Sequence, residues 1–117
     1  MKVIIAGSRD IDDYSLVEKA VAQSGFEITE VVSGGARGVD FLGEQWALNN
    51  HIRTTAFPAQ WAAYGRAAGP IRNEKMAQYA EALIAVWDGK SAGTRNMIEN
   101  AEKRGLKVFV YKVESQS

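Results

Sequence analysis

Short apolar runs and amphipathic segments alternate along the whole chain. Runs rich in valine, isoleucine and other apolar residues are typical of buried strands, and they cover residues 2–6, 28–33, 52–57, 82–87 and 107–111. Between these runs, apolar residues recur at the spacing of one helix face over residues 14–24, 39–50, 71–80 and 94–104. Gly25 and Gly105 follow two of these segments, where glycine commonly ends a helix.

Strands that alternate with helices predict an α/β fold in which a parallel sheet carries helices on both faces. We expect one Rossmann-like, three-layer domain over residues 1–113, with a five-stranded sheet in the order 3-2-1-4-5, and a flexible tail over residues 114–117. Residues 58–69 are predicted to be a long irregular connection, and Pro70 suits the first turn of the next helix. Ligands of such sheets bind at the carboxyl ends of the strands, where the strand order reverses.

Composition narrows the classes of function. Apolar residues make up 46% of the chain, and 14 basic side chains balance 14 acidic ones, so no excess charge favours nucleic acid or an anionic membrane. Cysteine is absent, which excludes disulfides, zinc–thiolate sites and cysteine nucleophiles. The apolar start is too short for a signal peptide and no stretch is long enough to span a bilayer, so we expect a soluble cytoplasmic protein.

Three glycine-bearing loops fall at the predicted carboxyl ends of strands and lead into helices. Glycine lets the backbone approach a ligand closely, and the helix N-terminus that follows attracts anions, so phosphate suits such loops. Each loop alone is equally well explained as a tight turn, whereas three at one edge of the sheet favour a binding site. The candidate ligand-binding residues are Gly7, Ser8, Arg9, Ser33, Gly34, Gly35, Ala36, Arg37, Gly38, Gly89, Ser91, Gly93 and Thr94.

Two known phosphate-binding fingerprints do not fit these loops. The second loop has two adjacent glycines and then Gly38, which is not the spaced pattern of dinucleotide-binding proteins. Gly89-Lys90-Ser91 resembles the end of a P-loop, but Ile84 stands where a P-loop requires glycine. A P-loop ATPase is therefore excluded.

Arginines beside the loops are candidate phosphate clamps, because a guanidinium binds phosphate oxygens through two parallel hydrogen bonds. Arg9, Arg37 and Arg72 fit this role, whereas Arg95, inside a predicted helix, is interpreted as a surface residue.

The connection over residues 58–69 is long for so small a domain, and long ordered connections are often functional. Trp61 or Tyr64 is suited to stack on a base, with Arg66 reaching a phosphate. The alternative is a short helix whose aromatic side chains cover the core.

Asp40, Glu44 and Asp88 are the candidate catalytic carboxylates. Asp40 and Glu44 are four positions apart and share a helix face, although Asp40 also suits a helix cap or first turn. Asp88 follows the fourth strand, where it would bind a ribose hydroxyl or order its loop. His51 is interpreted as structural, and without a cluster of His, Asp and Glu we predict no metal site and no cofactor beyond a nucleotide-like ligand.

Four motifs occur in the same order in a known family, namely Ala6-Gly7-Ser8-Arg9, Ser33-Gly34-Gly35-Ala36-Arg37-Gly38-Val39-Asp40, Ala68-Gly69-Pro70-Ile71-Arg72-Asn73 and Trp87-Asp88-Gly89-Lys90-Ser91-Ala92-Gly93-Thr94. Over nearly the whole chain they resemble the YspA/YpsA-related branch of the SLOG superfamily. The resemblance implies a Rossmann-like domain that binds a nucleotide or a nucleotide-derived phosphate ligand, either ADP-ribose-like or a nucleoside monophosphate, as a sensor or processing domain. It adds Asn73 to the candidate ligand-binding residues.

The LOG enzymes of the same superfamily define the alternative of an N-glycosidase or phosphoribohydrolase acting on nucleotides. They carry an arginine with a methionine four positions on, similar to Arg72 and Met76, and a glycine-threonine pair similar to Gly93-Thr94. A catalytic glutamate closely follows that pair in LOG enzymes, whereas the first acid here is Glu99. A hydrolase of this kind would rely on one of the three candidate carboxylates.

The DNA-processing A proteins of the superfamily define a third alternative, a module that binds single-stranded DNA. The balanced charge of the chain argues against it, because affinity for the phosphate backbone depends on many cations. We also expect a homo-oligomer, since small Rossmann-like domains often pair through helices.

Overall fold

The two central strands, β1 (Lys2–Gly7) and β4 (Ala82–Trp87), are almost wholly apolar because helices cover both of their faces. In this computed structural model, which describes residues 1–114, they pair in parallel from Val3 opposite Ala82 to Gly7 opposite Val86. The complete sheet has five parallel strands in the order β3-β2-β1-β4-β5. This confirms the predicted fold and strand order. Residues 115–117 of the expected tail lie outside the described residues.

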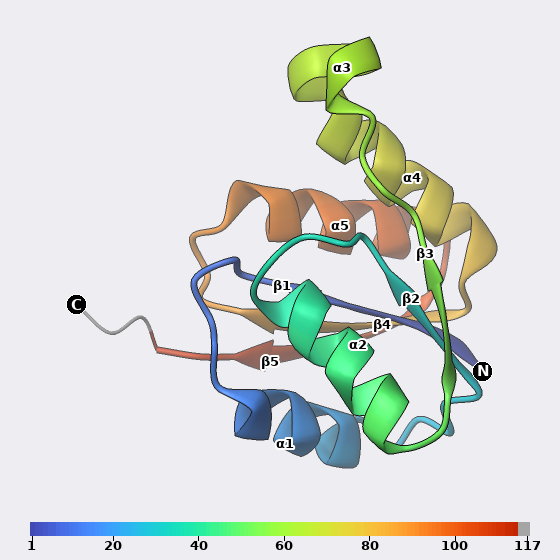
Figure 1. The fold of residues 1–117 in the computed structure, drawn as a ribbon, viewed down its shortest axis with the longest axis vertical. Helices are drawn as coiled ribbons and strands as arrows, with labels where there is room; N and C mark the ends of the chain where they lie inside the picture. The colour runs from blue at the N-terminus through green and yellow to red at the C-terminus, as the bar shows by residue number, and fades with distance from the viewer. Residues whose placement is uncertain (115–117) are drawn as a thin grey trace.

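The outer strands are β2 (Glu30–Ser33), β3 (Arg53–Ala56) and β5 (Lys107–Lys112). Two helices, α1 (Tyr14–Ser24) and α2 (Val39–Asn49), cover one face of the sheet, and α4 (Ala68–Tyr79) and α5 (Ala92–Lys103) cover the other (Figure 1). Because side chains alternate along a strand, β1 supplies Val3 and Ile5 to the first core and Ile4 and Ala6 to the second.

The prediction of an irregular connection over residues 58–69 is wrong from Trp61 onward. Residues Trp61–Tyr64 form α3, Gly65–Ala67 form a short 3₁₀ helix, η1, and α4 begins at Ala68. Four alanines in this stretch favour helix, and Pro70 is tolerated because the first N–H groups of a helix have no partner within it. Trp61 and Tyr64 are 51% and 47% exposed, so these aromatic side chains do not cover the core as the helical alternative supposed.

The reversal of strand order between β1 and β4 positions the loops that matter for function. The chain leaves β1 and β2 toward α1 and α2 on one face, whereas β4 leads to α5 on the other (Figure 1). The loops therefore diverge at the carboxyl edge of the sheet and leave a crevice between them. Within residues 1–114, no helix is sufficiently long and apolar to cross a membrane.

A buried carboxylate anchors the opposite edge of the sheet. Glu30, at the start of β2, accepts hydrogen bonds from the hydroxyls of Tyr79 and Thr55, and its other oxygen lies 3.4 Å from Arg53 Nε. The Tyr79 hydrogen bond is the largest of the interactions that hold the pKa of Glu30 below its ordinary value of 4.5, and Thr55 and Arg53 act in the same direction. This cluster ties α4 to β2 and β3.

We expect Glu30→Ala to lower the free energy of unfolding by about 1–3 kcal/mol at neutral pH, because it leaves the Tyr79 and Thr55 hydroxyls without their acceptor. The folded-state pKa is lowered, so this stabilisation is complete above the ordinary pKa and is lost as the pH falls through the lowered value. Urea unfolding at neutral and acidic pH measures both effects. Glu18→Ala, at an exposed position of α1, is the control, and an equal loss in both variants would refute the role of Glu30.

Candidate functional site

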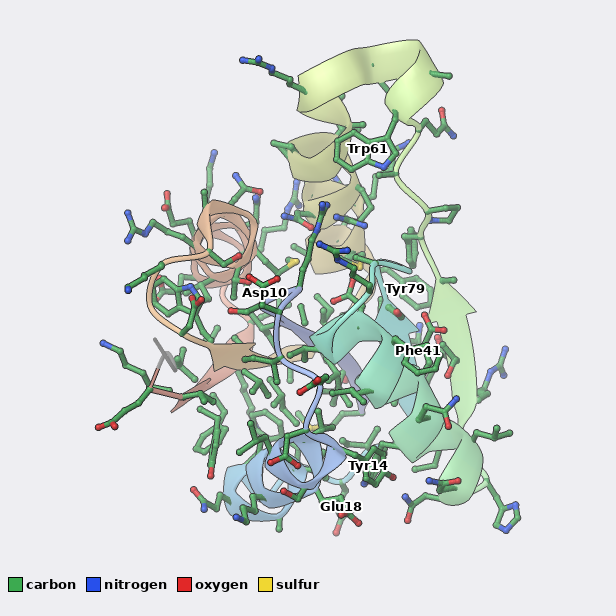
Figure 2. All side chains as sticks on the ribbon, turned by 60° about the vertical axis from the view of Figure 1, so that its left-hand side comes forward. Asp10, Tyr14, Glu18, Phe41, Trp61 and Tyr79 are labelled. Atoms are coloured by element: carbon green, nitrogen blue, oxygen red, sulfur yellow. The ribbon has the colours of Figure 1, made fainter. Side chains whose placement is uncertain are left out.

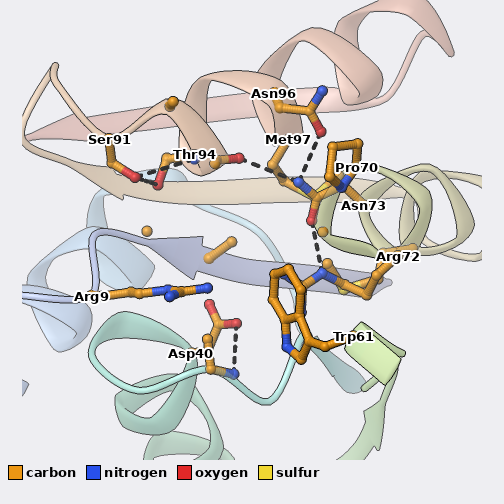
Figure 3. A pocket seen from close by; sticks show the side chains of 17 residues that line it. Arg9, Asp40, Trp61, Pro70, Arg72, Asn73, Ser91, Thr94, Asn96 and Met97 are labelled. Atoms are coloured by element: carbon orange, nitrogen blue, oxygen red, sulfur yellow. Dashed lines mark hydrogen bonds between the residues drawn. The ribbon is translucent and has the colours of Figure 1, made fainter. Parts of the chain in front are cut away.

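A cavity of about 270 Å³ lies at the carboxyl edge of the sheet, at the reversal between β1 and β4. Its walls come from the loop after β1, the loop after β2, the α3–α4 segment and the first turns of α5 (Figure 3). The structure thus brings these predicted residues together: Gly7, Arg9, Ala36, Asp40, Trp61, Arg72, Asn73, Ser91, Gly93 and Thr94.

A second, more open hollow of about 610 Å³ adjoins the cavity. Arg9, Ala36, Trp61 and Arg72 line both spaces, and Gly34, Gly35 and Arg37 line the second alone. Trp61 reaches from α3 toward the body of the molecule (Figure 2), so the helix that was predicted as a loop still supplies an aromatic wall. The two hollows thus share walls formed by Arg9 and Arg72.

The N-terminus of α5 forms one wall of the cavity. Ser91 caps the helix, because its Oγ accepts hydrogen bonds from the Thr94 N–H at 3.4 Å and from the Thr94 hydroxyl at 3.0 Å. Ala92 and Gly93, the first two residues of the helix, line the cavity. Their N–H groups have no intrahelical partner, and the helix dipole is positive at this end, so this wall favours an anion.

Arg72 extends from α4 across the cavity to the loop after β2. Its Nη1 donates a 2.6 Å hydrogen bond to the carbonyl oxygen of Gly34, and its Nε donates to Asn73 Oδ1 at 2.9 Å. Burial lowers the pKa of the Arg72 guanidinium, and the nearby Asp40 carboxylate partly opposes this change. The guanidinium is therefore a positive charge fixed in the wall of the cavity.

Asn73 is buried, and its polar atoms are engaged by the protein. While its Oδ1 accepts from Arg72, its Nδ2 donates to Asn96 Oδ1 at 2.9 Å and to the Gly93 carbonyl at 3.3 Å (Figure 3). Asn73 thereby joins α4 to α5 and orients Arg72. In the cavity wall, Asn73 therefore holds Arg72 and the start of α5 in place.

Asp40, in the first turn of α2, is 6% exposed, yet it lines the cavity. Its Oδ2 accepts a 3.2 Å hydrogen bond from the Ala36 N–H, and its carboxylate and the end of Arg9 point toward one another (Figure 3). Burial raises the pKa of Asp40 to about 6, and Glu44 adds to this rise, whereas the Ala36 N–H, Arg72 and Arg9 oppose it. A carboxyl with such a pKa exchanges protons near neutral pH.

Glu44 and Ser33 lie behind the loop after β2. Ser33 Oγ donates to Glu44 Oε2 at 2.6 Å and accepts from the Gly35 N–H at 3.1 Å. Neither residue lines the cavity. The pair instead shapes the turn that carries Gly34 and Gly35 to the second hollow.

Asp88 directly follows β4 and does not line the cavity. Its Oδ1 accepts hydrogen bonds from the N–H groups of Lys90 and Ser91, which hold the pKa of Asp88 below its ordinary value. The buried Ser8 accepts from the Asp88 N–H and joins this loop to the end of β1. Asp88 thus orders the turn through Gly89, and faces a separate hollow with Asp10, Asp12 and Asp13.

Two further predicted residues lie outside both hollows. Gly38 has φ +77°, and a Cβ there would lie 2.5 Å from the Ser8 carbonyl oxygen, so glycine allows the loops after β1 and β2 to touch. Arg66 lies exposed on η1 and lines neither hollow.

Residues that line the cavity without having been singled out as ligand contacts include Met76, Asn96 and Met97. The signal for them is helical spacing: Met76 follows Arg72 by one turn of α4, and Met97 follows Gly93 by one turn of α5. The apolar side chains of Met76 and Met97 form a floor beneath the polar walls of the cavity. Among residues 1–114, no group of three or more His, Cys, Asp or Glu side chains is arranged to hold a metal ion.

We expect Gly34→Ala to lower the free energy of unfolding by about 1–3 kcal/mol, because a Cβ there would lie 2.5 Å from Arg72 Nη1 and 2.8 Å from Asp40 Oδ2. Gly93→Ala is the matched control. Its Cβ meets nothing within 4 Å, and alanine in a helix gains up to about 1 kcal/mol over glycine. Chemical unfolding of both variants measures the difference. If Gly34→Ala were as stable as the unsubstituted protein, the Arg72 side chain could move away from the added Cβ without loss of stability, and the expectation would be wrong.

Comparisons with known proteins agree with the motifs. The fold is similar to that in the X-ray structure of DNA processing protein A (DprA) from Streptococcus pneumoniae, with a TM-score of 0.74 and 24% sequence identity. That match covers 93% of this chain and 49% of the other, so the chain spans about half the length of DprA. At this identity, the likeness supports the fold alone.

A sequence relative spans nearly the whole chain, and a family model identifies the family. The "Gene 61 protein" of Mycobacterium phage D29 is 33% identical over 118 residues, which cover 92% of this chain and 94% of that relative. The model of the YspA, cpYpsA-related SLOG family matches residues 1–64, which include the loops after β1 and β2. The chain therefore belongs to the YspA, cpYpsA-related SLOG family.

Proposed function

We propose that the protein binds a nucleotide or a nucleotide-derived phosphate ligand in the cavity at the carboxyl edge of the sheet, as a sensor or processing domain. The observation that carries the proposal is that Arg9, Arg72 and the first turn of α5 line the same cavity. Two guanidinium groups and a helix N-terminus together favour a phosphate. Family membership supports a nucleotide-related ligand over other phosphate esters.

The remaining walls suit the rest of a nucleotide. Trp61 is half exposed and lines both hollows, which leaves its ring available to stack on a base. Met76 and Met97 form an apolar floor. The cavity alone has about 270 Å³, near the lower limit of pockets that hold small molecules, and the adjoining hollow extends it.

A small ligand fits these observations better than DNA does. DNA processing protein A is named for DNA processing, but this chain has balanced charge, with 14 basic and 14 acidic side chains, which gives it no general attraction to the phosphate backbone. The expected self-association stays a prediction that size-exclusion chromatography tests. Phe41 (Figure 2) and Leu48 lie exposed on α2, one of the helices that could pair with a second copy.

We expect at least one of AMP, ADP, NAD and ADP-ribose to raise the melting temperature, because a ligand that binds only the folded state stabilises it. Arg9→Gln should lower the affinity for that ligand by about tenfold or more. The substitution removes an exposed cation that lines both hollows, and it leaves the core undisturbed. Arg95→Gln, on the exposed side of α5, is the control and should bind normally. Absence of any shift in the unsubstituted protein would refute the proposal for these compounds.

A second candidate function is hydrolysis of a nucleotide at its N-glycosidic bond. The observation that favours it is Asp40, a buried carboxyl with a pKa of about 6 in the wall of the cavity. Such a group is suited to donate or accept a proton in the reaction.

If the protein is a hydrolase, nucleoside monophosphates or NAD should release a free base that chromatography detects. Asp40→Asn should lower the rate by about 100-fold or more, because the amide cannot transfer the proton. Asp88→Asn, whose side chain lies outside the cavity, should retain most of the rate. Binding of these compounds without any breakdown would leave the binding proposal standing and exclude hydrolysis of them.

A further inference from the structure

Asp40 is a negative charge placed among groups that bind anions. It extends from α2 toward Arg72 of α4 and Arg9 of the loop after β1, and the other titratable group that affects it is Glu44. Arg72 Nη1 and Asp40 Oδ2 approach the same point of the backbone, since a Cβ on Gly34 would contact both. The carboxylate therefore lies beside the cations that a phosphate would use.

The charges of the site balance differently with and without a ligand. In the free protein, the Asp40 carboxylate offsets part of the charge of Arg9 and Arg72. A phosphate that approaches the same arginines introduces a second anion next to a carboxylate that is only 6% exposed. Two anions that share a buried site repel each other, and the carboxylate relieves the repulsion when it gains a proton.

We propose that Asp40 is an internal counter-anion of the site, which balances Arg9 and Arg72 in the free protein and takes up a proton when a phosphate ligand binds. This inference rests on the proposed function, and it adds that binding consumes a proton from solvent. The proton is transferred to the Asp40 carboxylate, and no covalent bond of the ligand changes. Asp40 thus sets the dependence of affinity on pH.

The direction of this dependence follows from the state of Asp40 in the free protein. With a pKa of about 6, Asp40 is mostly ionised at neutral pH. The ligand prefers the protonated form, so affinity is greatest below this pKa and falls as the pH rises above it. Because a single proton is linked to binding, the fall is at most about tenfold per pH unit.

Titration calorimetry with ADP-ribose tests the proposal, because its pyrophosphate exchanges no proton near neutral pH. The measurement is made at pH about 7 in two buffers of different ionisation enthalpy, such as Tris and PIPES. We expect the two binding heats to differ by the ionisation heat of nearly one proton per ligand. Asp40→Asn should show equal heats and bind about tenfold more tightly at this pH, which lies one unit above the pKa of about 6.

Glu44→Gln is the matched control. Glu44 is the second acid of α2, but it contacts Ser33 and does not line the cavity, so this variant should retain the difference between buffers. Equal heats in the unsubstituted protein would overturn the inference and leave the proposed function standing, and this result does not require that Asp40→Asn folds. Absence of binding of ADP-ribose, AMP, ADP and NAD alike, in the unsubstituted protein and in Asp40→Asn, would overturn both.

Discussion

The position of the Arg72 guanidinium is the constraint on which the candidate site depends. It extends from a helix on one face of the sheet to the loop that precedes a helix on the other face, and its 2.6 Å hydrogen bond to the Gly34 carbonyl joins them. A charge in that place requires a glycine at position 34, an acceptor for Nε on Asn73 and a nearby anion on Asp40. Several features of the loop therefore follow from one partly buried charge.

The fold and the location of the site could be predicted from the sequence because both depend on local patterns. Apolar runs and helical spacing specify the alternation of strands and helices, and that alternation implies a parallel sheet. The glycine loops then fall at one edge. For residues 61–69 the sequence left a short helix only as the alternative to an irregular connection, because glycines and a proline obscured the helix-forming alanines.

The roles of single polar residues could not be predicted, because they depend on partners distant in sequence. Glu44 and Asp40 share a helix face, yet Glu44 bonds to Ser33 while Asp40 faces the cavity. Asn73 belongs to a motif but is fully engaged by Arg72, Gly93 and Asn96. A DprA-like fold is therefore compatible with different ligands, since the identity of the ligand depends on such individual contacts.

The protonation proposed for Asp40 also bears on whether ligand binding would lead to chemistry. Glycoside hydrolysis usually requires two carboxyl groups, one to protonate the leaving group and one to stabilise the cationic sugar or activate water. Among the described residues that line the cavity, Asp40 is the only acid. A carboxyl that gains a proton when the ligand binds can protonate a leaving base, but it no longer offers a negative charge to the sugar. The arrangement of charges therefore favours reversible binding over hydrolysis.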